Sequence, residues 1–478
     1  MKVKPFLLLF CTVSYLFGGG LVTNTNQSAE FIRMMNRNAS IDADAVYFNP
    51  AGTAFMEEGM HLYVSNQSIL QTKIINNNYP YLHNGKYEGQ VKALVFPNIY
   101  SVINRGKLAF SLGFGPIGGG GSAEFEKGLP SFELPYSDLK PGLGQYGVTD
   151  YGIDLYFKGS SVYYGITSNI AYKINDMLAI SIGGRYVSAV NKYEGYLKNV
   201  TVTQGENVNP APAQDFFNNL SGSAAQAAQY YSNIGMLDSA AYFATVAAQM
   251  AAKAILMADQ EADVTQKGSS VIPVIGLNVK LNDNLMVSFR YEMKGSMKVK
   301  NETKKDVLVG YTQDGDPITK FPDGAEIGSD IPSMVAFGAF AKFSPKLKVM
   351  SDINYFINSD IDWDGKEEYV NNEYEVGVGA EYDFLDKLSI SAGYLLSRTG
   401  AMENYQSDMT YGLDSQTIGV GGKFILAQGV FLSAGFSTTF YSQSEKNFTH
   451  LLDTQSIPVV EKYDKTASVF AVGLGFSF

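Results

Sequence analysis

FAVGLGFSF, residues 470–478, ends the chain and alternates bulky apolar residues with small ones. The bulky residues occupy every second position, which we term one parity of the strand: Phe470, Val472, Leu474, Phe476 and Phe478. Only alanine, glycine and serine occupy the other parity. Because successive side chains of a strand point to opposite faces, the pattern predicts a strand with large apolar side chains on one face only.

A second stretch, residues 373–384, repeats the alternation with charge on its other face. Its apolar parity carries Tyr374, Val376, Val378, Ala380, Tyr382 and Phe384. Its polar parity carries Glu373, Glu375, Glu381 and Asp383. In a soluble sandwich the apolar face would point inward, whereas in an outer-membrane barrel it faces lipid and the polar face lines the lumen. The strands alone fit both architectures.

The connections favour the barrel, because short and long ones alternate. Tight turns are predicted at residues 104–106, 175–176, 282–284, 344–346, 385–387 and 427–429. Long polar loops are predicted at residues 76–88, 115–150, 204–267, 301–331, 358–372, 397–414 and 442–466. These six turns and seven loops would join fourteen strands, which predicts an all-β, antiparallel, up-and-down transmembrane barrel. Such barrels turn tightly on the periplasmic side, so we expect both chain ends there.

Composition agrees with a single barrel and argues against other classes of protein. The 478 residues show no linker-like shift in composition, and charged residues make up only 17% of the chain. Soluble domains carry about 25% charged residues. The net charge of -11 argues against nucleic-acid binding, which needs a basic surface. No apolar run is long enough for a spanning helix.

The first residues predict export. Lys2 and Lys4 precede an apolar run that is too short to span a bilayer but fits a signal peptide, predicted at residues 1–19. The single cysteine, Cys11, lies inside it, so the mature chain would contain no disulfide. A lipoprotein anchor is the alternative, and the bulky Phe10 before the cysteine argues against it.

The segment between the signal peptide and the first strand lacks barrel periodicity. Residues 28–56 read SAEFIRMMNRNASIDADAVYFNPAGTAFM. Its blocks NAS at 38–40, DADA at 42–45 and YFNPAG at 47–52 resemble the FadL family of outer-membrane transporters, which take up long-chain fatty acids and, in some members, aromatic hydrocarbons. The resemblance extends through the strand order, through Ile331-Pro332-Ser333 at the start of one strand, and through the terminal aromatic residue.

The resemblance implies a fourteen-stranded barrel, residues 58–478, whose lumen is plugged by residues 20–57, termed the hatch. The hatch motif comprises Asn49, Pro50, Ala51 and Gly52. The motif favours a turn, because proline fixes its own φ and keeps the preceding residue out of the α region. Taken alone, it would fit a simple loop corner. A plug is physically reasonable, since an open barrel of this size would leak water.

The glycine-rich run at 113–118 reads GFGPIG and formally matches a dinucleotide-binding motif. That interpretation fails, because more glycines follow where the motif needs a helix. Proline cannot donate to a strand ladder and glycines permit a bend, so we predict a kink in the third strand. The kink residues are Gly113, Gly115, Pro116 and Gly118. The resemblance implies that this kink opens the wall for lateral release of substrate; the alternative is a strand that ends in a flexible loop.

The long loop at 204–267 is rich in alanine and predicts two helices, at 223–232 and 237–259, broken at 233–235. The second helix would have one apolar face, formed by Phe243, Val246, Met250 and Met257. That face would either collect substrate as a greasy cap or pack the loop against its neighbours.

A fatty-acid site needs apolar walls and one or two cations for the carboxylate. The candidate apolar residues of the hatch are Phe31, Met34, Met35, Tyr47 and Phe48. The candidate cations are Arg185 and Arg290, which fall on the polar parity of their strands and should face the lumen. Alternatively, each arginine would pair with an acidic neighbour such as Glu292.

Other chemistries find little support. Asp360, Asp362 and Asp364 imitate the start of a calcium-binding loop, but Asn371 stands where a bidentate glutamate is required. An acidic external loop is the better interpretation. The three histidines lack metal-ligand spacing, and no G-x-S-x-G sequence appears. We expect no enzyme activity, no cofactor and no metal.

Three functions remain open. The first is passive, selective transport of a hydrophobic molecule that binds in the lumen and passes when the hatch shifts. The others are a general polar porin and a surface binding or adhesion barrel, which the acidic loops would support. The expected partners are a hydrophobic small molecule, outer-membrane lipids, and the barrel-assembly machinery through the C-terminal strand ending in Phe478. We expect a monomer in the bacterial outer membrane and no nucleic-acid partner.

Overall fold

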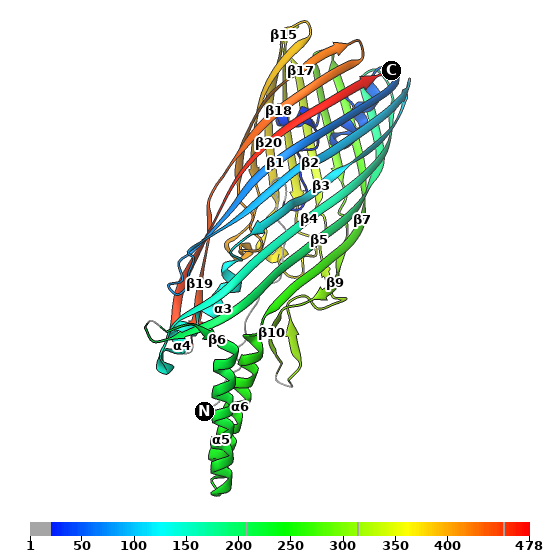
Figure 1. Ribbon diagram of the computed structural model, residues 1–478. Coiled ribbons are helices and arrows are strands. Elements are labelled where there is room, and N and C mark those ends of the chain that lie inside the picture. The colour runs from blue at the N-terminus through cyan, green and yellow to red at the C-terminus, as the bar shows by residue number, and fades with distance from the viewer. Residues whose placement is uncertain (1–20, 207, 313–314, 453–454) are drawn as a thin grey trace.

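A computed structural model describes residues 21–206, 208–312, 315–452 and 455–478. The predicted signal peptide, with Cys11, lies outside the described residues. Figure 1 shows a tall barrel of strongly tilted strands, with a helical hairpin that extends from one end.

The strands close into one antiparallel barrel with fourteen wall strands among the described residues, which confirms the predicted fold. Eleven of them are continuous: β1 (Gly59–Asn77), β2 (Lys86–Arg105), β3 (Leu108–Phe125), β4 (Val148–Lys173), β5 (Leu178–Gln204), β7 (Gln260–Asn282), β14 (Leu347–Ile357), β15 (Glu373–Leu385), β16 (Leu388–Arg398), β17 (Ser415–Ala427) and β20 (Gln455–Ser477). Three are each split into two: β8 (Leu285–Glu292) with β9 (Lys298–Lys305), β12 (Glu326–Gly328) with β13 (Ser333–Lys342), and β18 (Val430–Tyr441) with β19 (Ser444–Leu452). β1 pairs with both β2 and β20, so the first and last strands form the closing seam.

The two ends of the barrel differ as the connections predict. The tight turns, such as that between β2 and β3, lie at the end where the chain terminates, which we term the short-turn end. The opposite, long-loop end carries the smaller elements α3 (Pro130–Ser137), α4 (Leu139–Gly142), η2 (Gly144–Tyr146), β6 (Ala211–Pro212), β10 (Leu308–Tyr311), β11 (Pro317–Thr319), η3 (Glu367–Tyr369) and η4 (Glu403–Tyr405). One predicted loop is much shorter in the structure. Residues 442–466 mostly form β19 and the start of β20, which pair with each other.

The apolar parity of the wall strands faces outward. Phe470 and Val472 are 55% and 53% exposed, whereas Ala471 between them is 3% exposed. On β15, Tyr374 and Val378 are exposed while Glu373 and Glu375 are buried toward the lumen. An apolar outer surface of this kind is what a lipid environment requires. Among the described helices, none has both the length and the apolar composition needed to cross a membrane.

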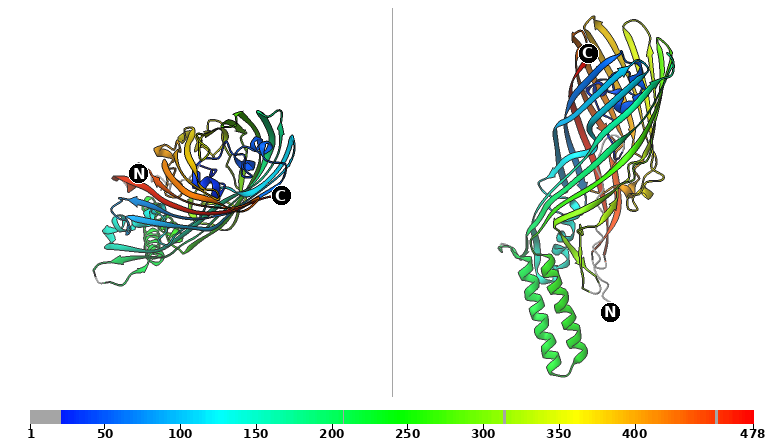
Figure 2. Two further views of the ribbon diagram at one scale, coloured as in Figure 1. Left: turned by 90° about the horizontal axis from the view of Figure 1, so that it is seen from above. Right: turned by 90° about the vertical axis from the view of Figure 1, so that its right-hand side faces the viewer.

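The hatch lies inside the barrel, as both views in Figure 2 show, and near the short-turn end, as the right-hand view shows. Its elements are α1 (Ala29–Met34), α2 (Ala45–Phe48) and η1 (Pro50–Phe55). The Ser28 hydroxyl caps α1 by accepting the Phe31 N–H, and it donates to Asp44 at 2.8 Å. Asp44 also accepts two hydrogen bonds from Arg37, at 2.8 and 2.9 Å. Burial alone would lower the pKa of Arg37, but Asp44 and Asp42 raise it well above its usual value, so this ion cluster holds the hatch together in its charged form.

The helical hairpin consists of α5 (Ala213–Asn233) and α6 (Leu237–Leu256) and extends beyond the long-loop end (Figures 1 and 2). Both predicted helices form, but α5 begins at Ala213 rather than at residue 223. Its extra turns pack into the loops, because Ala213 and Phe217 are buried there. Gly235 has φ +78° and lies in the turn between the two helices, within the predicted interruption.

Candidate functional site

Helix α1 of the hatch lies against a patch of glycines in the wall. A Cβ atom on Gly379 would lie 2.2 Å from the carbonyl oxygen of Met34, and one on Gly419 would lie 2.3 Å from that of Ile32. This glycine patch comprises Gly377, Gly379, Gly393, Gly419, Gly421 and Gly435, on β15 to β18. A side chain at these positions would push the helix off the wall. The sequence shows these alternate glycines, but nothing in it connects them with the hatch.

The hatch motif is anchored on another part of the wall. The Asn49 side chain accepts the Ala51 N–H and donates to the carbonyl oxygen of Leu277 on β7 at 3.0 Å. Pro50 begins η1, and a Cβ atom on Gly52 would lie 2.1 Å from the Ser40 carbonyl oxygen. The motif therefore turns the hatch chain and ties it to the barrel.

Arg185 on β5 and Arg290 on β8 are buried and face the lumen, as their parity predicts. Arg185 donates to both carboxylate oxygens of Glu292, at 2.8 and 3.0 Å, and its guanidinium carbon lies 4.4 Å from the centre of the Tyr47 ring. Arg290 donates to the Tyr47 carbonyl oxygen and lies 3.4 Å from Glu292. Both arginines thus pair with Glu292, the predicted alternative to contact with a ligand. Because both also contact Tyr47, they anchor the hatch to the wall.

The wall is interrupted between β2 and β3. The two strands pair from Arg105–Leu108 to Ile99–Phe114 and again at Val91–Ala123. Between these points, residues 92–98 and 115–122 do not pair with one another. β3 stays paired with β4 but shifts register after Pro116 and again after Gly118. The interruption therefore begins at Gly115, Pro116 and Gly118 of the predicted kink, whereas Gly113 keeps a regular partner in Tyr100.

The first described residues of the hatch lie along this interruption. Thr23 forms an isolated antiparallel bridge with Gly118, and the Asn24 N–H donates to the Ile117 carbonyl oxygen at 2.8 Å. The Asn24 side chain donates to the Gly119 carbonyl oxygen at 3.1 Å. Any shift of this hatch segment therefore breaks its bonds with the irregular part of β3.

A cavity of about 340 Å³, which we term the wall cavity, lies between the hatch and the interrupted wall. Phe31, Ile32 and Met35 line its hatch side. Ala93, Val95, Phe96, Pro97, Pro116 and Gly118 to Gly121 line its side toward β2 and β3. Glu375, Ser397, Ser415 and Tyr441 line the remaining wall. Its volume lies within the range of small-molecule sites, about 300–1,000 Å³.

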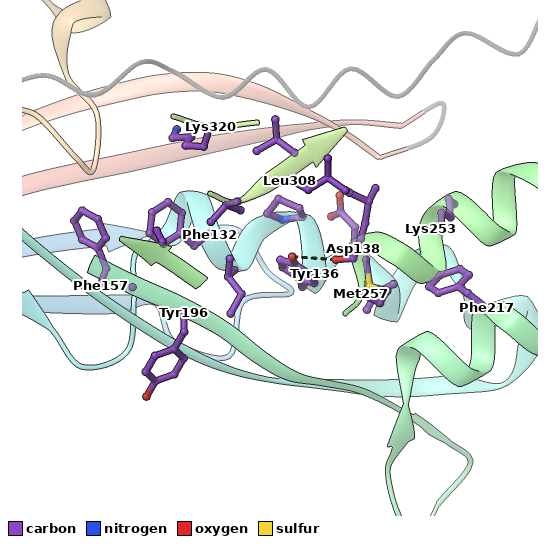
Figure 3. Close-up of a pocket in the computed structure, with 18 of the residues that line it drawn as sticks. Phe132, Tyr136, Asp138, Phe157, Tyr196, Phe217, Lys253, Met257, Leu308 and Lys320 are labelled. Carbon is purple, nitrogen blue, oxygen red and sulfur yellow. Dashed lines mark hydrogen bonds between the residues drawn. The ribbon is translucent and has the colours of Figure 1, made fainter. Parts of the chain in front are cut away.

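A smaller cavity of about 190 Å³, which we term the mouth cavity, lies at the long-loop end (Figure 3). Its lining is mostly apolar and comes from α3, the bases of α5 and α6, and β10, including Phe132, Phe217, Met257 and Leu308. Burial raises the pKa of Tyr136 to about 12, so its phenol stays protonated and donates to the Leu256 carbonyl oxygen at 3.4 Å. The cavity therefore offers an apolar surface with few polar groups.

An aromatic cluster lies between the two cavities. Its members include Tyr87, Phe125, Phe157, Phe321, Tyr411 and Tyr463. Phe157 and Phe321 also line the mouth cavity, and Val91 of the same cluster lines the wall cavity. The side chains between the two cavities are therefore mainly aromatic and apolar.

The predicted hatch residues fall into two groups. Phe31 and Met35 line the wall cavity, and Phe48 stacks on Phe31 with ring centres 5.6 Å apart. Met34 and Tyr47 instead hold the hatch, through the glycine patch and the two arginines. Their ligand contacts remain predictions.

The apolar face predicted for α6 is used mainly inside the hairpin and at its base. Phe243 stacks on Tyr231 of α5 with ring centres 5.3 Å apart, and Met250 packs against the buried cluster at the base. Met257, just past the end of α6, lines the mouth cavity. Phe243 and Met250 therefore pack the loop against its neighbours, which is one of the two predicted roles of this face. Met257 faces a cavity, which fits the other predicted role, the collection of substrate.

Comparison with known proteins agrees with this geometry. Residues 158–478 match the family model described as outer membrane protein transport protein (OMPP1/FadL/TodX). No curated protein matches the chain. A FadL homologue from Pseudomonas aeruginosa is similar in structure, with a TM-score of 0.60 and 14% identity over 97% of this chain and 99% of that one. The toluene transporter TodX from P. putida gives a TM-score of 0.55 and 12% identity over 91% and 94% of the two chains.

The toluene transporter TbuX from Ralstonia pickettii gives a TM-score of 0.54 and 13% identity over 94% of this chain and 98% of that one. At identities this low, the solved structures show only that the barrel fold is shared. The family membership rests on the family model, which covers well over half of the sequence. The chain therefore belongs to the FadL/TodX family of outer-membrane proteins that transport hydrophobic compounds.

Proposed function

We propose that the protein takes up long-chain fatty acids or similar apolar molecules passively and releases them sideways through the interruption between β2 and β3. The observation that carries this proposal is the position of the wall cavity between the hatch and the interrupted strands. Outside the interruption, Leu94 and Val95 are 61% and 75% exposed. An apolar molecule leaving the cavity would meet these aliphatic side chains and then lipid.

In this proposal the long-loop end faces the exterior and the short-turn end faces the periplasm. The mouth cavity captures the molecule, which then passes the aromatic cluster and reaches the wall cavity. Release follows when the segment around Thr23 and Asn24 leaves β3. The driving force is the concentration gradient, helped by transfer of the apolar molecule into the bilayer.

The filled lumen argues against a general porin. The hatch occupies the barrel interior. The ion pair of Arg37 with Asp44 holds it together, and that of Arg33 with Glu381 ties it to the wall. Steady ion conductance of the purified protein would contradict the proposal and favour the porin alternative.

Two neighbouring substitutions on β2 test lateral release. Ala93 lines the wall cavity beside the interruption, whereas Leu94 points outward. Ala93→Trp should fill the exit and strongly reduce uptake of radiolabelled palmitate by cells that express the protein. Leu94→Trp places the same side chain on the lipid side and should leave uptake near the wild-type level. Equal uptake by the two variants, at equal amounts of folded protein, would refute lateral release at this place.

A further inference from the structure

Lys73 of β1 and Lys465 of β20 lie directly opposite each other across the closing seam. Both side chains point into the barrel, and the residues are 1% and 2% exposed. Among the described residues, Nζ of Lys73 has no hydrogen-bond partner, and Nζ of Lys465 lies over the rings of Tyr441 and Tyr411, 4.8 and 5.7 Å from their centres. Like charges opposite each other on paired strands repel, and a buried ammonium without a partner is costly.

The other fully buried cations of the described chain do not share this situation. The four fully buried arginines all have carboxylates beside them: Arg33, Arg37, Arg185 and Arg290. Within the described part of the chain, the two lysines have only each other and two aromatic rings as neighbours of their ammonium groups. A single anion placed between them would accept hydrogen bonds from both ammonium groups and remove their repulsion.

The lysine pair borders the wall cavity. Gln71, two residues before Lys73 on the same face, and Ala467, two residues after Lys465, both line this cavity. The ring of Tyr441, over which the Lys465 ammonium lies, lines it as well. The lysines therefore stand at one edge of a space whose other walls include Phe31, Ile32 and Met35 of the hatch.

The register of the strands also gives the cavity a direction. Glu375 pairs with Ser397, Ser397 with Ser415, and Ser415 with Tyr441, and all four residues line the cavity. This row continues to Lys465, because the adjacent residues Phe440 and Thr466 pair. One end of the row is thus acidic and the other cationic. An anion would be repelled at the Glu375 end and attracted at the lysine end.

We propose that Lys73 and Lys465 bind the anionic head group of a singly charged amphiphile, such as a carboxylate, while its apolar tail lies in the wall cavity. The inference rests on the proposed transport function and names the substrate class: an anionic amphiphile rather than a neutral hydrocarbon. The tail contacts Phe31, Ile32 and Met35, and the head remains at the seam.

The test compares two ligands that differ only at the head. The full-length protein, purified in a neutral detergent, is titrated by equilibrium dialysis with radiolabelled palmitate or hexadecanol. Wild-type protein should prefer palmitate. Lys73→Met and Lys465→Met should each weaken palmitate binding by about tenfold and change hexadecanol binding by less than about threefold. Lys465→Arg should retain most of the preference, and Lys127→Met, an exposed loop control, all of it.

Thermal unfolding supplies a second, independent measurement. Removing one lysine removes the repulsion, so Lys73→Met should raise the Tm of the ligand-free protein. Palmitate should raise the Tm of the wild type and have a much smaller effect on the variant. Equal losses of palmitate and hexadecanol binding, or no preference for palmitate in the wild type, would overturn the lysine inference while leaving hydrophobic transport in place. Wild-type protein that binds neither ligand would overturn both proposals.

Discussion

A Cβ atom on Gly393 of β16 would lie 1.9 Å from the carbonyl oxygen of Met34 in the hatch, the tightest contact of the glycine patch. Neither group can yield easily, because one is wall backbone and the other ends a buried helix. The fit between hatch and wall at this point therefore depends on the absence of a side chain.

Gly393→Ala should loosen the hatch without opening the barrel wall. The expected result is higher ion conductance in planar bilayers and faster proteolysis within residues 21–57. Gly222→Ala is the matched control, because its new methyl group on α5 would meet no atom of the described residues within 4 Å. Wild-type conductance of Gly393→Ala would show that the wall adjusts around the extra methyl group.

The buried pair of Arg185 and Glu292 should contribute to stability mainly as a pair. Arg185→Met leaves the Glu292 carboxylate buried with Arg290, at 3.4 Å, as its one remaining cation among the described residues, and should reduce the free energy of unfolding by about 3 kcal/mol. The double variant Arg185→Met/Glu292→Gln should lose clearly less than the sum of the two single losses. Urea unfolding in liposomes measures this coupling, and additivity within about 0.5 kcal/mol would argue against it.

Asp408 should make the long-loop end sensitive to pH. It is buried and accepts the Ser131 N–H at 2.8 Å; burial raises its pKa, and the hydrogen bond offsets only part of the rise. Asp408 therefore takes up its proton at a higher pH in the folded protein than in the unfolded chain. Below about pH 3.9, the usual pKa of an unfolded aspartate, Asp408 is protonated in both states and does not affect the free energy of unfolding. As the pH rises from there toward the higher pKa of Asp408 in the folded protein, ionisation of the unfolded chain alone increasingly destabilises the fold.

Loop 399–414 should therefore be better protected at mildly acidic than at neutral pH. Asp408→Asn should remove this difference and increase protection at neutral pH. Hydrogen-exchange protection factors at two pH values provide the measurement, and the exposed Asp360→Asn serves as control. A pH difference that persists unchanged in Asp408→Asn would assign the effect to another group.

The base of the helical hairpin should matter for capture more than its distal part. Phe217 lines the mouth cavity, whereas Phe243 stacks on Tyr231 farther along the hairpin. Phe217→Ala should weaken binding of a fluorescent apolar probe, and Phe243→Ala should leave it unchanged. Equal effects of the two substitutions would show that the hairpin acts through its overall stability.

Sequence parity predicted the directions of side chains well. Phe470 and Tyr374 face outward and Arg185 faces inward because a two-residue repeat fixes the face wherever a strand is regular. Loop lengths were predicted less well. On β20 the outward residues Lys462 and Thr466 are polar, so this part of the strand resembles a loop in sequence.

The lysine pair lay beyond the reach of sequence patterns. Lys73 and Lys465 become neighbours only through the register of the seam, and a slip of one residue would turn one of them outward. The contact between the glycine patch and α1 is likewise a relation between distant segments. Periodicity gives the face of a residue but not its partner across the lumen.

The seam also has a kinetic consequence. It joins the two ends of the barrel sequence, and contacts this distant along a chain form late because the loop between them must first be closed. Until then Lys73 and Lys465 are on separate, unpaired edges, and the proposed head-group site does not exist. Amphiphile binding would therefore report the moment at which the newly made barrel completes its assembly.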